Sequence, residues 1–193
     1  MAQLSDFIIS RVRVKLLSIF LSKPGEMYYV RELTRIAKEE INAIRRELKR
    51  MQDVGMLKSE KRSNRLYYNY NISHPFYPEL LNLVTKSSSV GQQLIKNKSK
   101  LGYIKYVFLS QKLIRGIDRD SDHIDLLIIG QVIMPQLSLI VKKLEKILDS
   151  EINYSSMTEE EYKYRKSRKD PFITSVLLQP RIMIIGDETK LLA

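Results

Sequence analysis

The stretch from Glu39 to Gly55, EEINAIRRELKRMQDVG, constrains the fold of this chain most, because it carries two different faces at helical spacing. Its apolar residues recur three or four positions apart, and its basic and amide residues fall on the opposite side. Such long cationic and amide side chains can reach the phosphates and base edges of duplex DNA, although an ordinary solvated helix has the same pattern. The inward set is Ile41, Ile44, Leu48 and Met51, and the outward set is Asn42, Arg45, Arg46, Lys49 and Arg50.

The net charge of +11 is unevenly distributed along the chain. Residues 1–72 hold 15 Lys and Arg against 8 Asp and Glu, residues 73–105 hold 5 against 1, and residues 106–193 hold 13 against 13. A polyanion-binding module followed by a neutral partner domain explains this division. A membrane surface explains it less well, because the basic residues lie among turn and strand signals and not on one long amphipathic helix.

The composition excludes several kinds of site. The sequence has no cysteine, which excludes disulfides, thiolate zinc sites and cysteine nucleophiles. His74 and His123 are the only histidines that could serve a metal site or a catalytic triad. No apolar run approaches the roughly 20 residues of a membrane span, and the N-terminus lacks a signal-peptide pattern. We therefore expect a cytoplasmic protein without a metal, a cofactor or a membrane partner.

Helix and strand signals fill the first 72 residues. Ser5 or Asp6 is a candidate cap for the first helix, and Phe7 and Ile36 are among the apolar residues expected inside. Gly55 is placed to end the basic helix. In chain order the pattern predicts a helix over 4–22, a β-prone run over 27–30, a helix over 31–37, a tight turn over 38–40, the helix at 39–55, and a hairpin of strands 57–61 and 65–71 with a basic tip.

This order of elements resembles the winged helix-turn-helix of the ArsR-like bacterial and archaeal transcription regulators, over roughly residues 4–72. The run ELKRMQDVGMLKSEKRSNRLYYNYN carries the resemblance. For Tyr67, Tyr68 and Tyr70 we expect packing in the hairpin and not stacking on bases. The resemblance implies that Asn42, Arg45, Arg46 and Lys49 lie in or beside the major groove, and that Arg62, Asn64 and Arg65 meet the backbone or the minor groove.

Residues 73–102 form the predicted connection between the two halves. Pro75 and Pro78 break the preceding strand, and helix-compatible pieces follow at 79–84 and 90–95, separated by a run of three serines. We expect a helical linker that contributes dimer contacts, and a flexible hinge is the alternative.

Residues 103–193 change to alternating strand and helix signals, which predicts an α/β domain with a mixed sheet. Thr158 is the expected cap of an acidic helix start. The pattern predicts strands over 103–109, 124–129, 151–155 and 181–185, and helices over 135–149, from 159 onward and over 171–178.

The stretch VFLSQKLIRGIDRDSDHIDLLIIG, residues 107–130, resembles the signature of the minimal nucleotidyltransferase domains. Such enzymes hold a triphosphate on a Gly-Ser turn and bind two Mg²⁺ ions through paired carboxylates. Gly116 matches the second glycine of the signature and Asp125 its second aspartate. Lys112 and its neighbour Gln111 replace the Gly-Ser pair, His123 replaces the first aspartate, and Asn153 stands where a third carboxylate is usual.

One carboxylate of three cannot assemble the metal pair, so we predict no nucleotidyl transfer and no catalytic residue. Two interpretations of the degenerate site stay open. In the first, the domain is a scaffold with His123 and Asp125 as solvated surface residues. In the second, Lys112 and Arg115 still bind a nucleotide or another anion as an effector.

The sequence thus predicts an α+β protein of two domains, with a winged helix-turn-helix of three helices and a hairpin wing over residues 1–72, a linker over 73–102 and a nucleotidyltransferase-like domain over 103–193. The expected function is that of a homodimeric transcription regulator that binds duplex DNA. The alternatives are a Mg²⁺-dependent nucleotidyltransferase recruited by its winged helix, and a protein-interaction module in which that domain binds protein.

Overall fold

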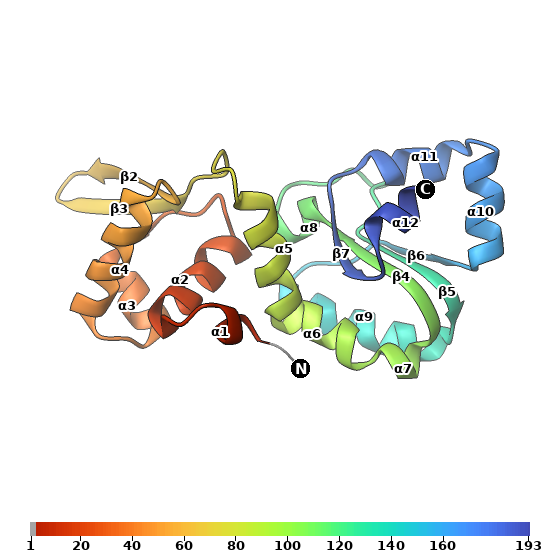
Figure 1. Cartoon of the computed structure of the whole chain (residues 1–193), viewed down its shortest axis with the longest axis horizontal. Coiled ribbons are helices and arrows are strands. Elements are labelled where there is room, and N and C mark those ends of the chain that lie inside the picture. The colour runs from red at the N-terminus through yellow and green to blue at the C-terminus, as the bar shows by residue number, and fades with distance from the viewer. Residues whose placement is uncertain (1–2) are drawn as a thin grey trace. The chain divides into compact units, whose positions relative to one another are not determined.

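The computed structural model describes residues 3–193 and has an α+β fold (Figure 1). The chain divides into two compact units, Met1–Ser87 and Ser88–Ala193. The boundary lies within the run of serines that separates the two helix-compatible pieces of the predicted connection.

The N-terminal unit combines helices with a three-stranded antiparallel sheet in the order β1-β3-β2. Tyr28 pairs with Tyr68 in this sheet, so the β-prone run before α3 is joined to the hairpin. The elements are α1 (Leu4–Phe7), α2 (Arg11–Ser22), β1 (Tyr28–Tyr29), α3 (Val30–Ala37), α4 (Ile41–Asp53), β2 (Leu57–Arg62), β3 (Arg65–Tyr70) and α5 (Tyr77–Ser87).

The predicted inner face of α4 packs into the core of this unit. Ile44, Leu48 and Met51 are buried, whereas Ile41, one turn earlier, is only half-buried. Gly55 follows the helix with φ +77°. This left-handed conformation costs glycine little, because glycine has no side chain. Its N–H donates to the carbonyl oxygen of Gln52 at 2.9 Å, as expected for the end of a helix.

The single helix predicted over residues 4–22 is wrong, because the chain leaves helical geometry between α1 and α2. Ser10 caps α2 by accepting a hydrogen bond from the N–H of Arg13 at 3.2 Å. Of the two predicted caps, Asp6 acts at the start of α1, where its carboxylate accepts a hydrogen bond from the N–H of Gln3 at 2.7 Å. The interruption turns Phe7 and Ile9 outward, and both are exposed. Ile36 of α3, also expected in the core, is exposed as well.

A buried carboxylate joins α4 to α2, which the sequence pattern did not predict. Glu47 lies on the inner face of α4 and is 4% exposed. It forms an ion pair with Arg13 and accepts a hydrogen bond from the Ser10 hydroxyl at 3.2 Å. Arg50, one turn later on α4, approaches the same carboxylate at 3.7 Å. The carboxylate is therefore held by groups from both helices.

The two helix-compatible pieces of the predicted connection are helical. The first is α5, which packs against α2 in the N-terminal unit and buries Tyr77 and Leu81. The second is α6 (Ser89–Lys96), which is followed by α7 (Lys98–Leu101) and belongs to the C-terminal unit, where Val90 and Leu94 are buried.

The C-terminal unit contains a mixed four-stranded sheet in the order β6-β5-β4-β7, which confirms the predicted sheet type. β5 is parallel to β6, and β4 is antiparallel to both β5 and β7. The remaining elements are β4 (Gly102–Ser110), α8 (Gln111–Arg115), β5 (Leu126–Val132), α9 (Met134–Leu148), β6 (Tyr154–Met157), α10 (Glu159–Ser167), α11 (Pro171–Leu178), β7 (Arg181–Ile185) and α12 (Glu188–Leu192).

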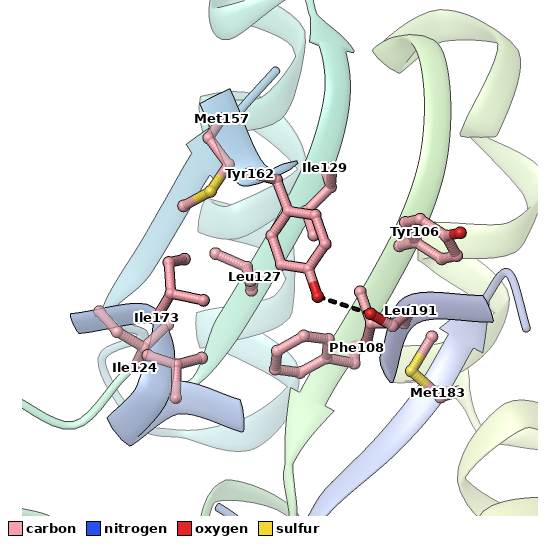
Figure 2. Packing of buried hydrophobic residues seen from close by; sticks show 11 residues of the cluster. Tyr106, Phe108, Ile124, Leu127, Ile129, Met157, Tyr162, Ile173, Met183 and Leu191 are labelled. Carbon is pink, nitrogen blue, oxygen red and sulfur yellow. Dashed lines mark hydrogen bonds between the residues drawn. The ribbon is translucent and has the colours of Figure 1, made fainter. Parts of the chain in front are cut away.

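Helices cover both faces of this sheet, which explains why the middle of each central strand, residues 106–109 of β4 and 126–129 of β5, is buried and apolar on both sides (Figure 1). Tyr106 and Phe108 of β4 pack with residues of α10, α11 and α12 in one cluster (Figure 2). Val107 and Leu109 alternate with them, are fully buried, and therefore point to the opposite face. A Cβ atom added to Gly130 would stand 2.3 Å from the carbonyl oxygen of Tyr103, which is closer than two non-bonded atoms approach.

One strand and several short helices of the C-terminal unit differ from the predicted elements. The strand expected over 151–155 is found three residues later, as β6. The short helices α7, α8 and α12 were not predicted, because four or five residues are too few to show a helical period. No helix in the described part of the chain is long and apolar enough to cross a membrane.

The buried carboxylate under α4 gives a testable prediction for stability. We expect Glu47→Ala to lower the free energy of unfolding by about 1–3 kcal/mol, because the change leaves the Arg13 guanidinium and the Ser10 hydroxyl without their partner. Glu60→Ala is the matched control, since Glu60 pairs with Arg62 on the surface of the hairpin and its loss should change stability much less. Chemical denaturation of the two variants measures the difference, and equal effects would contradict the assigned role.

Candidate functional site

The exposed face of α4 is the largest basic feature that the sequence predicted, and the structure arranges it as expected. Asn42, Arg45, Arg46 and Lys49 are all exposed, and their spacing places them on adjacent turns of one face. Within residues 3–193, no carboxylate forms an ion pair with Arg45, Arg46 or Lys49. Their positive charges are therefore available to an external anion.

Arg50 differs from these residues although it is also exposed. Its guanidinium lies 3.7 Å from the buried Glu47 carboxylate, so part of its charge is directed at the core of the unit. Arg50 thus lies at the margin of the basic face.

The start of α4 is fixed by two glutamates of the preceding turn. Glu40 accepts hydrogen bonds from the N–H groups of Asn42 at 2.8 Å and Ala43 at 2.9 Å, and these bonds lower the pKa of its carboxyl group. Glu39 binds Lys15 at 2.7 Å and Arg11 at 2.9 Å, and both bonds lower the pKa of Glu39. The turn between α3 and α4 is therefore attached to α2, which limits rotation of the basic face.

The hairpin tip carries the second group of predicted residues. Arg62 and Arg65 are direct partners at the end of the two strands, and Ser63 and Asn64 form the turn between them. The Arg62 guanidinium binds both oxygens of Glu60, at 3.0 and 3.1 Å, so its charge is partly compensated. The Arg65 guanidinium lies over the Tyr29 ring, 4.7 Å from its centroid, and keeps a net positive charge.

The three tyrosines of β3 mainly pack, as predicted. Tyr68 and Tyr70 are buried, and Tyr70 lies against Tyr77 of α5 with ring centroids 5.6 Å apart. Tyr67 is half-buried and makes an edge contact with Tyr29 at 5.6 Å. Neither buried ring is accessible to a base.

The hairpin and α4 are neighbours within the unit. The Gln52 side chain near the end of α4 donates to the Ser59 hydroxyl of β2 at 3.0 Å. At the other end of the hairpin, a cleft of about 400 Å³ lies between the tip and the start of α3, lined by Tyr29, Val30, Arg31, Asn64, Arg65 and Leu66. The arrangement offers an anion two basic surfaces that belong to one compact unit.

The predicted vestigial site of the C-terminal unit forms a buried polar cluster. Ser110, His123 and Asp125 are 2%, 7% and 3% exposed, so the interpretation of His123 and Asp125 as solvated surface residues is wrong. The Ser110 Oγ atom lies 2.6 Å from His123 Nε2 and also accepts a hydrogen bond from the N–H of Lys112 at 3.1 Å. Because Ser110 caps α8, its hydroxyl proton is free to be donated to a neutral imidazole.

One oxygen of the single carboxylate in this cluster has two partners. Asp125 Oδ2 forms an ion pair with Arg119 Nη1 at 2.7 Å and accepts a hydrogen bond from the Asn153 N–H at 3.0 Å. The Asn153 side chain in turn donates to the carbonyl oxygen of His123 at 3.0 Å. Asn153 thus stabilises the loop around the carboxylate by donating hydrogen bonds, where a third aspartate would have repelled it.

The cluster does not fit a pair of Mg²⁺ ions. Magnesium sites need several oxygen ligands, and here one carboxylate stands beside a guanidinium that already neutralises it. No group of three His, Cys, Asp or Glu side chains that could hold a metal ion exists among residues 3–193.

A catalytic triad is not formed either. In a triad the carboxylate binds the imidazole nitrogen opposite the serine. Here Asp125 Oδ1 is 4.0 Å from Nε2, the same nitrogen that contacts Ser110.

The remaining predicted residues of this site lie on or after α8. Lys112 and Arg115 are half-buried residues of this helix, and Gly116 ends it in the left-handed conformation with φ 62°. Lys112 is close enough to His123 to lower the pKa of the imidazole. Arg115 is not brought into the polar cluster by any hydrogen bond or ion pair among the described residues.

Sequence reasoning missed Ser110 and Arg119. Ser110 carried a usable signal, because a serine at a strand end before a short helix-forming run is a typical helix cap. Arg119 carried no such signal, because only the fold of the loop between Arg119 and Asp125 brings the two side chains together.

Comparison of the chain with protein-family models, curated proteins and solved structures finds no match.

The buried histidine gives a prediction for the pH dependence of stability. Burial is the main cause that lowers the pKa of His123 below 6.5; the charge of Asp125 opposes this shift, and the charges of Lys112 and Arg119 add to it. The unfolded chain therefore binds a proton at His123 before the folded chain does, and this residue reduces stability as the pH falls through about 6.5. We expect the free energy of unfolding to fall less between pH 7.5 and 5.5 in His123→Asn than in the wild type.

His74→Asn is the control for this measurement, because His74 is the other histidine and lies in the N-terminal unit. Thermal unfolding of the three proteins in buffers of equal ionic strength compares their pH slopes. An unchanged slope in His123→Asn would refute the assignment.

Proposed function

We propose that this protein is a DNA-binding transcription regulator whose N-terminal unit is a winged helix-turn-helix. The observation that carries the proposal is the pair of faces on α4, where Ile44, Leu48 and Met51 are buried while Arg45, Arg46 and Lys49 are exposed without ion-pair partners in the described chain. A helix held in this way can enter the major groove, which is about 12 Å wide, with its cationic side outward.

In this proposal α3 and α4 form the helix-turn-helix, and α4 is the recognition helix. Asn42 and Arg46 read base edges, because an amide suits adenine and a guanidinium suits guanine. Arg45 and Lys49 flank them and neutralise phosphates, and Arg50 adds a weaker contact at the margin. Phosphate contacts position the protein, and the base contacts supply sequence preference.

The hairpin is the wing of this domain. Arg65 and Asn64 at its tip contact the phosphate backbone or the minor groove. Arg62 contributes less than Arg65, because its guanidinium is already bound by both oxygens of Glu60. The unequal state of these two arginines supports different roles for them.

A homodimer is the proposed binding species. One recognition helix reads only a few base pairs, and two-fold symmetry doubles the length of the site. The C-terminal unit, and the helices that lead into it, would then supply contacts to a second copy, to another protein or to an effector. We propose that this unit is related to the nucleotidyltransferase fold without carrying its reaction.

The proposed lack of activity rests on Asp125. Nucleotidyl transfer needs carboxylates that hold two metal ions in line with the triphosphate. Asp125 is neutralised by Arg119, and its neighbours His123 and Asn153 are neutral groups where carboxylates would be needed.

Substitution of the basic face tests DNA binding. After selection of bound sites from a random duplex library, we expect Arg46→Ala to weaken binding by about 1–3 kcal/mol and to relax the preference at the base it contacts. Arg45→Ala should weaken binding to all sequences and reduce the salt dependence. Fluorescence anisotropy at several salt concentrations measures both quantities.

Arg168→Ala is the matched control, because Arg168 is exposed on the C-terminal unit and its loss changes the net charge equally. Unchanged affinity and salt slope in both α4 variants would remove DNA recognition from this face. Absence of any salt-dependent DNA binding by the wild type would favour the protein-interaction module.

Incorporation of labelled nucleotide tests the proposed inactivity. With Mg²⁺, all four nucleoside triphosphates and a cell extract as acceptor, we expect the wild type to incorporate no more label than Asp125→Asn. Incorporation that depends on Mg²⁺ and is abolished in Asp125→Asn would establish the nucleotidyltransferase alternative.

A further inference from the structure

Four lysines converge on one cleft of the C-terminal unit, and none of the four belongs to the surfaces or the polar cluster described above. The cleft encloses about 410 Å³, and its basic lining consists of Lys105 on β4, Lys163 and Lys166 on α10, and Lys190 on α12. Glu159 is the one acidic side chain of the lining. The local excess of positive charge contrasts with residues 106–193, where basic and acidic residues are equal in number.

Glu159 holds two of these ammonium groups together. Lys105 and Lys163 bind the same oxygen of Glu159, Lys163 at 2.7 Å. The two contacts lower the pKa of the Glu159 carboxyl group, and the contact with Glu159 raises the pKa of Lys105. One negative charge therefore positions two positive charges that it cannot neutralise.

The other two lysines keep their charge uncompensated. The Lys166 ammonium donates to the carbonyl oxygens of Leu191 at 3.1 Å and Leu192 at 2.7 Å, which are neutral acceptors at the end of α12. Lys190 is exposed and, within the described residues, forms no ion pair. Ala193, the last residue of the sequence, also lines the cleft, so the four ammonium groups stand against the Glu159 carboxylate and one terminal carboxylate, which leaves an excess of two positive charges.

The floor of the cleft is formed by aromatic and apolar side chains. Tyr106, Tyr162 and Leu191 line it and belong to the buried cluster of this face of the sheet. The Tyr162 hydroxyl donates to the carbonyl oxygen of Leu191 at 2.7 Å, which fixes α12 against α10 (Figure 2). The lysines of three separate elements are therefore held around a shared and ordered base.

We propose that this cleft binds a small soluble polyphosphate, of the size of a nucleoside di- or triphosphate. Ammonium groups are strong point-charge donors to phosphoryl oxygens, and several of them around one cleft suit a ligand with several such oxygens. The volume lies within the range of ligand pockets, roughly 300–1,000 Å³, and exceeds what one phosphate group needs. The site is separate from the buried cluster of Ser110, His123 and Asp125, and it does not depend on DNA binding by α4.

Titration calorimetry of the full chain tests the site, with inorganic pyrophosphate and ATP as probes at low ionic strength. We expect saturable binding, weakened by about tenfold or more in the double variant Lys163→Gln and Lys190→Gln, because each substitution removes a charged donor. Both side chains are well exposed, so the double variant should fold, which circular dichroism verifies.

The double variant Lys142→Gln and Lys143→Gln is the matched control, since it removes two exposed lysines of α9 outside the cleft and should bind both probes as the wild type does. Tighter binding of ATP than of pyrophosphate would identify a nucleotide as the ligand, and equal binding would identify the phosphates alone. Absence of saturation, or an equal loss in the control, would overturn the proposal.

A third variant separates this site from the proposed DNA-binding face. Arg45→Ala with Arg46→Ala should lose DNA binding and keep polyphosphate binding. Loss of polyphosphate binding in this variant would place the anion on α4 and overturn the cleft, whatever the outcome of the DNA experiments.

Discussion

The buried Glu47 carboxylate is the interaction on which the proposed function of this protein depends. It lies under α4 and is bound by Arg13 and Ser10, so the helix is fixed to α2 by a charged contact in addition to apolar packing. A carboxylate in a core is tolerated only when its partners satisfy it, and they can do so in one orientation of the helix. The rotation that satisfies Glu47 is the rotation that turns Arg45 and Arg46 outward. The same orientation of α4 therefore satisfies the packing inside the unit and exposes the basic face.

The same principle separates the two basic surfaces of the N-terminal unit. On α4 the carboxylates nearest the exposed arginines form no ion pair with Arg45 or Arg46, because Glu47 faces the core and Glu40 caps the helix. On the hairpin, Glu60 faces the solvent and binds Arg62 directly. A count of positive charges treats these arginines as equal, whereas the placement of the carboxylates makes some free to bind an anion and others not.

In the C-terminal unit, the polar groups of the buried cluster bind mainly to one another. Arg119 stands against Asp125, and the amide of Asn153 donates to the groups around it. Burial keeps His123 neutral by lowering its pKa, so the cluster holds one ion pair and no excess charge. The uncompensated charge of this unit lies instead in the lysine cleft, where a single glutamate serves two of four lysines.

The sequence by itself determined the α+β class, most helices and strands, the mixed sheet and the inner face of α4, because periodicity and turn residues are local signals. It also indicated which α4 side chains point outward, and these are exposed. Only the tertiary structure decided the break at Ser10, the burial of Asp125, the pairing of Arg119 and the convergence of Lys105 with Lys190. Each of these depends on residues that are brought together by folding, and whether a charge is free or compensated is a property of its neighbours in space.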